Sequence, residues 1–242
     1  MKSTTIRKIF HPFTRIPGVR TILGPMYKKL IYGPARQREI DMFQQNALSV
    51  LSEFNIVLEK AGVQYCLMWG SLIGAVRERG FIKHDFDIDV AVRIPEDNKD
   101  KVVAALLKAG FKHKHRFLVD GGINGMEDTV TKDGVDIDIF YIYKDRETGK
   151  EYCTSFNVID NETSWEACIK KHGNLNCYRF FFPFPEHFVK TRFETIEMPI
   201  PDNYDEILKS YYGDGYMTPN PGWKSRDADY KWPERIVDYK TF

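Results

Sequence analysis

The chain has 242 residues, of which 43% are hydrophobic and 29% are charged, and its formal net charge is +1 at pH 7. A chain of this length buries a sizeable core without disulfide bonds, so we expect one main domain. Its longest apolar run is far shorter than the roughly 18 residues that cross a bilayer, which argues against an integral membrane protein.

The first 38 residues form a basic arm, with nine Lys or Arg and no Asp or Glu, whereas the other 204 residues carry a net charge of about −8. Bulky apolar side chains lie between these cations, a mixture that suits a segment on an anionic membrane surface. The alternative is a helix packed on the domain. Four prolines interrupt any long amphipathic helix in the arm: Pro12, Pro17, Pro25 and Pro34.

The cysteines and the N-terminus indicate a cellular compartment. No apolar stretch typical of a secretory signal follows the early cations, and the chain has four cysteines. Thiols in a chain without such a signal indicate a reducing environment. We therefore expect a cytoplasmic protein, peripheral on the inner face of the membrane if the arm binds there.

The elements after the arm alternate between helix and strand. Residues 39–61 carry apolar side chains at helical spacing, and Gly62 supplies a stop. A short strand over 63–69, a tight turn at Gly70-Ser71 and a helix over 72–79 follow. Residues 87–94 alternate with the period of a strand, and a helix follows between Pro95 and Gly110.

The second half begins with strands and ends in an aromatic segment. We expect strands near 113–119 and 127–132, and residues 134–143 carry the strongest strand signal in the chain. From about residue 150 the chain becomes aromatic and rich in proline. We therefore expect an α+β fold with a mixed sheet flanked by helices. Its parts are a basic amphipathic arm, a catalytic core and a C-terminal cap packed on that core: residues 1–38, 39–150 and 151–242.

Three aspartates, Asp85, Asp87 and Asp89, alternate at the start of the strand that follows the Gly70-Ser71 turn. Alternate side chains of a strand share a face, which would place these carboxylates roughly 7 Å apart. Partly buried carboxylates at this spacing raise one another's pKa, and a divalent cation with oxygen ligands relieves their repulsion. The pattern therefore predicts a Mg²⁺ or Mn²⁺ site.

A second pair, Asp136 and Asp138, repeats this relation in the strand over 134–143. If the two strands are neighbours, carboxylates from both converge. The glycine of the Gly70-Ser71 turn permits close approach of the backbone to a phosphate, the serine donates its hydroxyl, and the following helix dipole favours an anion. Taken together, these features indicate phosphoryl transfer. Taken singly, each one is also typical of a solvated rim charge or an ordinary turn.

Three segments resemble the LicD/fukutin-related family. They are WGSLIGAVRERGFIKHDFDIDVAV at 69–92, DIDIF at 136–140 and the Pro-rich tail at 193–221. The resemblance implies a nucleotidyltransferase fold and the transfer of a phospho-substituent, such as phosphocholine, from a CDP-linked donor to a sugar hydroxyl of a cell-surface glycan. The chain departs from the family pattern at His84 and Phe86, where the family has Trp and a middle Asp.

The resemblance also implies roles for individual residues. Three carboxylates would be catalytic and would bind the metal: Asp87, Asp89 and Asp138. Two residues would hold the donor phosphates: Gly70 and Ser71. Three nearby cations are candidates for the leaving phosphates, with a solvated helix face as the alternative: Arg77, Arg79 and Lys83. Two further acids would either orient the ligands or be rim charges: Asp85 and Asp136.

Three other patterns invite separate interpretations. Four potential zinc ligands lie within 25 residues, although buried thiols are the alternative because no C-x₂-C pair is present: Cys153, Cys168, His172 and Cys177. The aromatic run at 177–188 would form either a choline-type cage or core packing. The segment KHKHR at 112–116 predicts a solvated strand, and we expect no nucleic-acid partner.

The expected activity is that of a metal-dependent phosphotransferase. It would move phosphocholine or a similar polyol or amino-alcohol phosphate from a CDP-linked donor to a hydroxyl of a cell-surface glycan or its lipid-linked precursor, with release of CMP. Two alternatives remain open. One is a nucleotidyltransferase that attaches NMP to a small molecule, protein or RNA, and the other is a non-catalytic binding module on the same fold.

Overall fold

The computed structural model describes residues 33–83, 85–93, 98–220, 222–223, 231–233 and 235–242. Most of the basic arm and His84 lie outside these described residues, so the expected contact of the arm with a membrane does too. No helix in the described part combines the length and the apolar character needed to cross a membrane.

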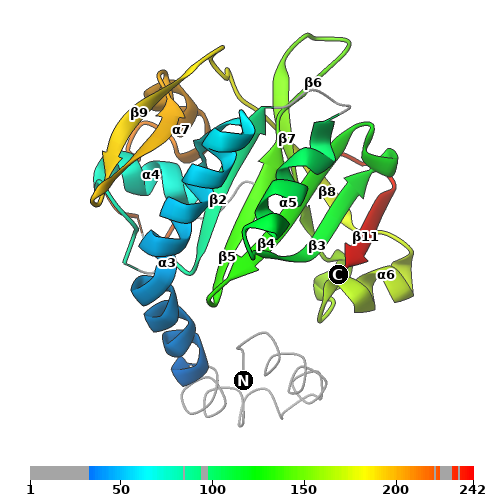
Figure 1. Ribbon diagram of the computed structural model, residues 1–242. Helices are drawn as coiled ribbons and strands as arrows, with labels where there is room; N and C mark the ends of the chain where they lie inside the picture. The colour runs from blue at the N-terminus through cyan, green and yellow to red at the C-terminus, as the bar shows by residue number, and fades with distance from the viewer. Residues whose placement is uncertain (1–32, 84, 94–97, 221, 224–230, 234) are drawn as a thin grey trace.

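A six-stranded sheet forms the centre of the fold, with strand order β1-β2-β5-β4-β3-β11 (Figure 1). In this order the strands are β1 (Gln64–Leu67), β2 (Asp87–Arg93), β5 (Val135–Tyr141), β4 (Gly125–Lys132), β3 (Lys112–Val119) and β11 (Val237–Thr241). β2 and β5 are parallel, and the other neighbours are antiparallel. The expected mixed sheet is confirmed.

Two helices, α3 (Gly33–Ala61) and α5 (Lys99–Lys108), cover one face of this sheet (Figure 1). The buried side chains of α3 include Phe43, Ala47, Leu51 and Phe54, which recur every three or four residues and form its apolar stripe. α3 begins six residues before the predicted start at 39, because a proline is well tolerated in the first turn of a helix. It ends at the predicted stop, where Gly62 adopts a φ of +65°.

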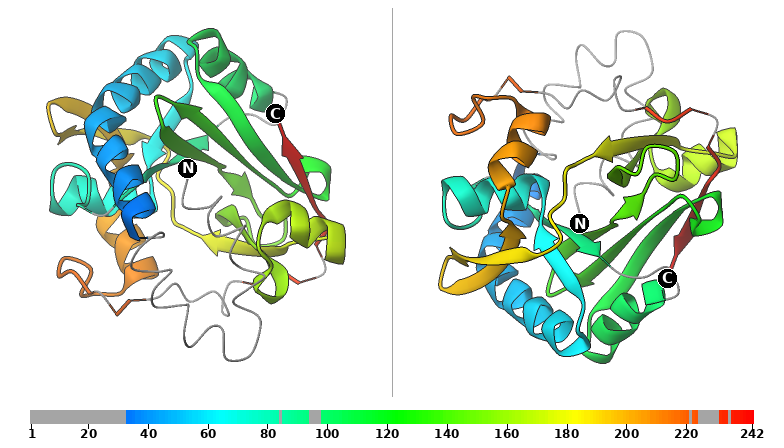
Figure 2. Two further views of the ribbon diagram at one scale, coloured as in Figure 1. Left: turned by 90° about the horizontal axis from the view of Figure 1, so that it is seen from below. Right: turned by 90° about the horizontal axis from the view of Figure 1, so that it is seen from above.

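The remaining elements lie on the other face and around the rim. A three-stranded sheet consists of β6 (Tyr143–Lys144), β7 (Glu151–Asn157) and β8 (Asn176–Phe181), and β7 packs against β4 and β5. α6 (Trp165–His172) contacts β11. The hairpin of β9 (Phe188–Phe193) and β10 (Ile196–Pro201) lies beside β1 and, together with α7 (Tyr204–Tyr212), beside α4 (Trp69–Arg77) (Figure 2). Two short 3-10 turns complete the fold: η3 (Asp120–Gly122) and η4 (Ile159–Asn161).

The C-terminal segment does more than cover the sheet. β11 pairs antiparallel with β3 and becomes the edge strand of the central sheet (Figure 2). The region expected as a cap over 151–242 therefore supplies a small second sheet, a hairpin beside α4 and one strand of the core. The chain folds back in this way because Val237, only 1% exposed, packs with Phe117 and Val119 of β3.

Candidate active site

Four carboxylates meet on one face of the central sheet. The parallel register of β2 and β5 sets Asp87 beside Asp136 and Asp89 beside Asp138. The intervening Ile88 of β2 and Ile137 and Ile139 of β5 point to the opposite, helix-covered face and are fully buried. Because the apolar side chains are buried against the helices, the aspartates of β2 and β5 must point to the other face of the sheet. The carboxylates of the two strands therefore converge there, as the sequence predicts.

The N-terminus of α4 lies against this cluster. The main-chain N–H of Asp89 donates to Ser71 Oγ at 2.9 Å, and the N–H of Met68 donates to the Asp89 carbonyl at 3.0 Å. The N–H of Gly70 donates to the Asp89 carboxylate. Met68, at the N-cap position, makes no side-chain capping bond, so its side chain leaves the first-turn N–H groups of α4 uncovered. This is the arrangement that a phosphate-bearing ligand requires.

Asp85 joins the site from a turn and not from the strand. β2 begins at Asp87, and the Asp85 N–H donates to the carbonyl of Ile82 at 3.0 Å. A Cβ placed on Gly70 would still lie 3.9 Å from both Asp85 carboxylate oxygens. Phe86, which strand alternation would place on the apolar face with Ile88, is instead 39% exposed, and the guanidinium of Arg36 lies 3.3 Å from its ring centroid.

The electrostatics of the cluster favour a bound cation. Burial raises the pKa of Asp87 to about 6 and that of Asp138 to about 7, and the neighbouring carboxylates add to both shifts. Burial also raises the pKa of Asp85 to about 6. The pKa of Asp89 is raised well above its usual range, first by burial and then by the charges of Asp87 and Asp138. A bound cation would relieve the repulsion between these acids when they ionise together.

Asp136 differs from the other three carboxylates because it has a cationic partner of its own. Lys114 of β3 donates to its carboxylate through Nζ. The other oxygen, Oδ1, is buried. Asp136 therefore lies beside the cluster with part of its charge already neutralised.

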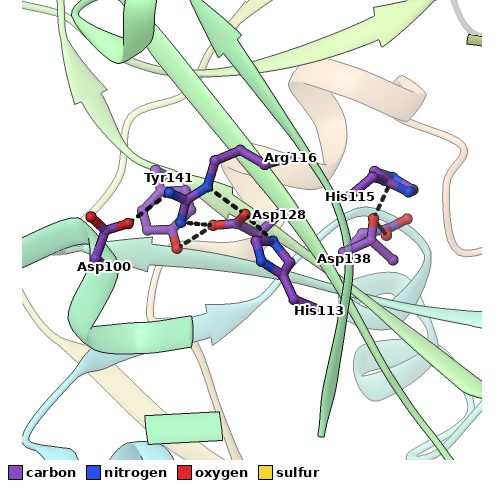
Figure 3. Close-up of polar contacts among 8 residues, drawn as sticks. Asp100, His113, His115, Arg116, Asp128, Asp138 and Tyr141 are labelled. Atoms are coloured by element: carbon purple, nitrogen blue, oxygen red, sulfur yellow. Dashed lines mark hydrogen bonds and ion pairs between the residues drawn. The ribbon is translucent and has the colours of Figure 1, made fainter. Parts of the chain in front are cut away.

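The described structure adds His115, Glu127 and Thr129, which the sequence analysis did not single out. One ligand atom from each of His115, Glu127 and Asp138 lies within 4.8 Å of the other two. The Thr129 hydroxyl donates to Asp138 and lies 2.8 Å from His115 Nε2. It therefore links the His115 and Asp138 side chains that Figure 3 labels. The expectation of a merely solvated strand over 112–116 was wrong. His115 alternates with its neighbours on β3, but its partners belong to other strands, so no local pattern reveals them.

A pocket of about 360 Å³ opens on this face of the sheet. Its lining combines carboxylates from β2 and β5 with residues of β3 and β4. α3 contributes Arg36 and Arg38, and α6 contributes Trp165. The candidate phosphate-binding cations do not line this pocket. Arg77 bonds Glu78 at 2.9 Å, and its charge offsets part of the rise in the pKa of Asp85. Arg79 and Lys83 are exposed.

The predicted zinc ligands occupy separate environments. Cys153 packs in the main core, whereas Cys168 and Cys177 belong to a second apolar cluster around Phe117. Cys168 Sγ accepts a bond from the Ile159 N–H at 3.2 Å. Within the described part of the chain, no three of Cys153, Cys168, His172 and Cys177 form a group that could hold a metal ion.

The aromatic run at 177–188 contributes mainly to packing. Tyr178, Phe180 and Phe182 are at most 8% exposed and belong to the main core. Trp69, at the start of α4, packs against Phe180 and lies 4.2 Å from the ring of Phe140. Trp69 also has a φ of +43°, a strained conformation for a non-glycine residue that is often found at functional sites.

The chain is similar to proteins that carry the same segments. The family description "LicD/FKTN/FKRP, nucleotidyltransferase domain" matches residues 62–203. The chain is 24% identical over 188 residues to "Ribitol-5-phosphate transferase FKTN" of Homo sapiens and of Macaca fascicularis. It is 28% identical over 188 residues to the Mus musculus protein of that name. These alignments cover 75% of this chain but only 35% of each relative, so the chain spans about a third of their length. The family match includes α4, β2 and β5, which together hold the acidic cluster, and the chain belongs to the LicD/FKTN/FKRP family.

Proposed function

We propose that this protein is a metal-dependent phosphotransferase with a nucleotidyltransferase fold. It moves phosphocholine or a similar polyol or amino-alcohol phosphate from a CDP-linked donor to a hydroxyl of a cell-surface glycan or its lipid-linked precursor, and CMP leaves. The observation that carries the proposal is the meeting of Asp87, Asp89 and Asp138 on two parallel strands beside the N-terminus of α4. The names of the relatives, which describe ribitol-5-phosphate transfer, support a polyol phosphate as the transferred group.

The acidic cluster fits a hard divalent cation. Asp87, Asp89 and Asp138 offer only oxygen ligands, which is the set that Mg²⁺ and Mn²⁺ prefer. Their raised pKa values reflect burial and mutual repulsion, which a bound cation relieves. Such an ion would neutralise charge that develops on the donor pyrophosphate.

The N-terminus of α4 supplies a second set of contacts for the donor. The Ser71 oxygen accepts the Asp89 N–H, and its own proton remains available for a phosphate oxygen. Gly70 has no side chain to block close approach of the backbone. Arg36 and Arg38 line the pocket and would stabilise the leaving CMP. Asp138 either binds the ion or accepts the proton of the acceptor hydroxyl, for which a pKa of about 7 is suitable.

The proposal is tested by following the fate of the nucleotide. Full-length protein is incubated with CDP-choline, CDP-ribitol and related donors, with Mg²⁺, Mn²⁺ or chelator, and CMP is quantified by chromatography. We expect metal-dependent release of CMP from one donor. Asp89→Asn should lower the rate by at least about 10³-fold because a metal ligand is lost. Asp202→Asn, an exposed aspartate outside the cluster, should keep the wild-type rate.

Two other results would overturn the proposal. Nucleotide retained on the product identifies the nucleotidyltransferase alternative, which uses the same site. Binding of a CDP-linked donor without turnover of any donor identifies a non-catalytic module.

We also propose that the basic arm attaches the protein to a membrane surface. The seven cations and the apolar side chains of residues 1–32 suit the anionic inner face of a membrane, next to a lipid-linked acceptor. A variant that lacks residues 1–32 leaves α3 complete. We expect it to lose sedimentation with phosphatidylserine vesicles and to keep turnover of soluble acceptors. Unchanged sedimentation would exclude the arm as the anchor.

A further inference from the structure

Three polar side chains form a row across adjacent strands next to the proposed donor site. The register places His115 of β3 opposite Thr129 of β4, and Thr129 opposite Asp138 of β5. Glu127 precedes Thr129 by two residues and therefore shares its face. The ligand atoms of His115, Glu127 and Asp138 lie within 4.8 Å of one another, a separation at which one ion can bind all three.

Glu127 shows independently that this group lacks a ligand. The residue is only 8% exposed, and its Oε2 has no hydrogen-bond partner among the described residues. It lines the pocket that also contains Asp87 and Asp138. A buried carboxylate oxygen without a partner is costly and calls for a missing donor or ion. By contrast, the adjacent Asp128 faces the other way and is fully hydrogen-bonded (Figure 3).

Thr129 holds two members of the group in place. Its hydroxyl donates to Asp138 and lies 2.8 Å from His115 Nε2. Outer contacts of this kind orient ligands and lower the entropy that is lost when an ion binds. The imidazole and carboxylates are therefore already positioned around one point in the pocket.

We propose that His115, Glu127 and Asp138 form a cation site of their own, which shares Asp138 with the Asp87/Asp89 pair. One imidazole nitrogen and two carboxylates suit Mn²⁺ or Zn²⁺ better than the oxygen-only pair does. Three protein ligands also leave coordination positions open toward the pocket, as in catalytic metal sites. The proposal that these three residues bind a cation depends only on their geometry. The proposal that this cation takes part in phosphoryl transfer rests on the proposed function.

The test detects the imidazole ligand directly and does not depend on activity. Full-length protein is loaded with Mn²⁺ alone, and electron spin echo envelope modulation is recorded for coupling to ¹⁴N. We expect ¹⁴N modulation in the wild type and in Asp89→Asn, and its loss in His115→Gln. The exposed His187 supplies the matched control, and His187→Gln should retain the modulation.

Affinity measurements test the carboxylate. Glu127→Gln should weaken the nitrogen-coupled Mn²⁺ by at least the roughly 10- to 100-fold that follows the loss of an outer-shell partner. Glu197→Gln, at an exposed position on β10, should not change it. Circular dichroism verifies that each variant is folded. Absence of ¹⁴N modulation at saturating Mn²⁺, or modulation that persists in His115→Gln, would overturn the proposed site.

The outcomes separate this inference from the proposed function. Metal-dependent CMP release that is lost in Asp89→Asn, together with no nitrogen-coupled ion, would leave the function standing and remove the second site. A nitrogen-coupled ion lost in His115→Gln, without turnover of any CDP-linked donor, would leave the site standing and remove the function.

Discussion

Asp89 and Ser71 are joined by a hydrogen bond of 2.9 Å from the main-chain N–H of the aspartate to the serine hydroxyl oxygen. The bond links β2 to the first turn of α4, and Ser71 is only 3% exposed. The carboxylate that we propose as a metal ligand and the turn that we propose for the donor are thereby held in one fixed relation. Positioning of this kind is what an active site requires from its supporting contacts.

Replacement of Ser71 should therefore lower the stability of the fold. Ser71→Ala leaves the Asp89 N–H without its partner, so we expect the free energy of unfolding to fall by roughly 1–3 kcal/mol. Urea denaturation measures this change. Ser49→Ala, at an exposed position on α3, should alter it by less than about 0.5 kcal/mol. Equal effects of the two substitutions would show that the bond contributes nothing.

The acidic cluster should make the metal-free protein less stable at high pH. Burial raises the folded-state pKa of Asp87 to about 6 and that of Asp138 to about 7, so the folded protein holds these protons more tightly than the unfolded chain. The protonated carboxyls therefore contribute their full stabilisation of the folded state below about pH 4, and this stabilisation is lost as the pH rises through 6 to 7. Burial lowers the pKa of His115 to about 4, which acts in the opposite direction between about pH 4 and 6.5.

Comparison with Asp138→Asn isolates the contribution of one carboxylate. In the presence of a chelator, the free energy of unfolding of the variant relative to that of the wild type should rise by about 2 kcal/mol from pH 5 to pH 8. Added Mg²⁺ should stabilise the wild type at pH 8 and much less at pH 5. Thermal unfolding at the two pH values measures both effects. A variant that loses stability relative to the wild type as the pH rises would contradict this prediction.

Gly70 and Gly74 of α4 should respond differently to the same substitution. A Cβ on Gly74 would lie 2.6 Å from the main-chain oxygen of Gly80, so Gly74→Ala should cost roughly 1–3 kcal/mol of stability. A Cβ on Gly70 would lie 3.5 Å from Asp89 Oδ2, an ordinary contact. Gly70→Ala should therefore keep its melting temperature. It should weaken donor binding about tenfold, or about 1.4 kcal/mol, because the methyl group occupies the approach of the phosphate.

Donor titration by calorimetry, alongside thermal unfolding, measures both glycine variants. Normal donor affinity in Gly70→Ala would remove the turn from the donor site. Normal stability in Gly74→Ala would show that the loop at Gly80 moves aside.

Asp128, on the helix-covered face of the sheet, should matter for stability alone. It is fully buried and accepts bonds from Arg116 at 2.7 and 3.0 Å and from Tyr141 at 2.8 Å, and it pairs with His113 at 2.7 Å. Burial opposes its ionisation, but the bonds from His113 and Arg116 outweigh burial and lower its pKa. Its contribution is therefore present above about pH 4 and is lost as the pH falls further.

Removal of the Asp128 carboxylate leaves the largely buried guanidinium of Arg116 without this partner. Asp128→Ala should cost roughly 3–5 kcal/mol of unfolding free energy, with the rate per folded molecule unchanged. Asp100→Ala removes the other, 86% exposed partner of Arg116 and should cost less than about 1 kcal/mol. Denaturant titration of the two variants provides the comparison, and similar costs would contradict the burial argument.

Much of this site follows from local patterns. The alternation of Asp136, Ile137 and Asp138 predicts a strand with one acidic and one apolar face, and β5 has these faces. A Gly-Ser pair after an apolar run predicts the turn into a helix, and α4 begins there. Side-chain direction within a strand or helix depends only on its own period, so these features need no knowledge of the rest of the chain.

Local sequence patterns gave wrong predictions for residues whose positions depend on contacts with distant strands and helices. Asp85 continues the alternation of Asp87 and Asp89, yet it lies in a turn because β2 begins where its pairing with β5 begins. His115 was interpreted as part of a solvated strand, although its strand neighbours place it beside Asp138. The basic segment around Arg36 was assigned to the arm, but it belongs to α3 and lines the pocket.

The sequence by itself determined which faces of the strands are acidic and which are apolar, because those faces repeat every two residues. Only the tertiary structure decided which strands became neighbours. The parallel pairing of β2 with β5 sets Asp89 beside Asp138, and β3 and β4 then add His115 and Glu127. The order of the strands depends on the burial of their apolar faces against α3 and α5. These faces come from distant parts of the chain, so no short stretch of sequence determines which strands pair.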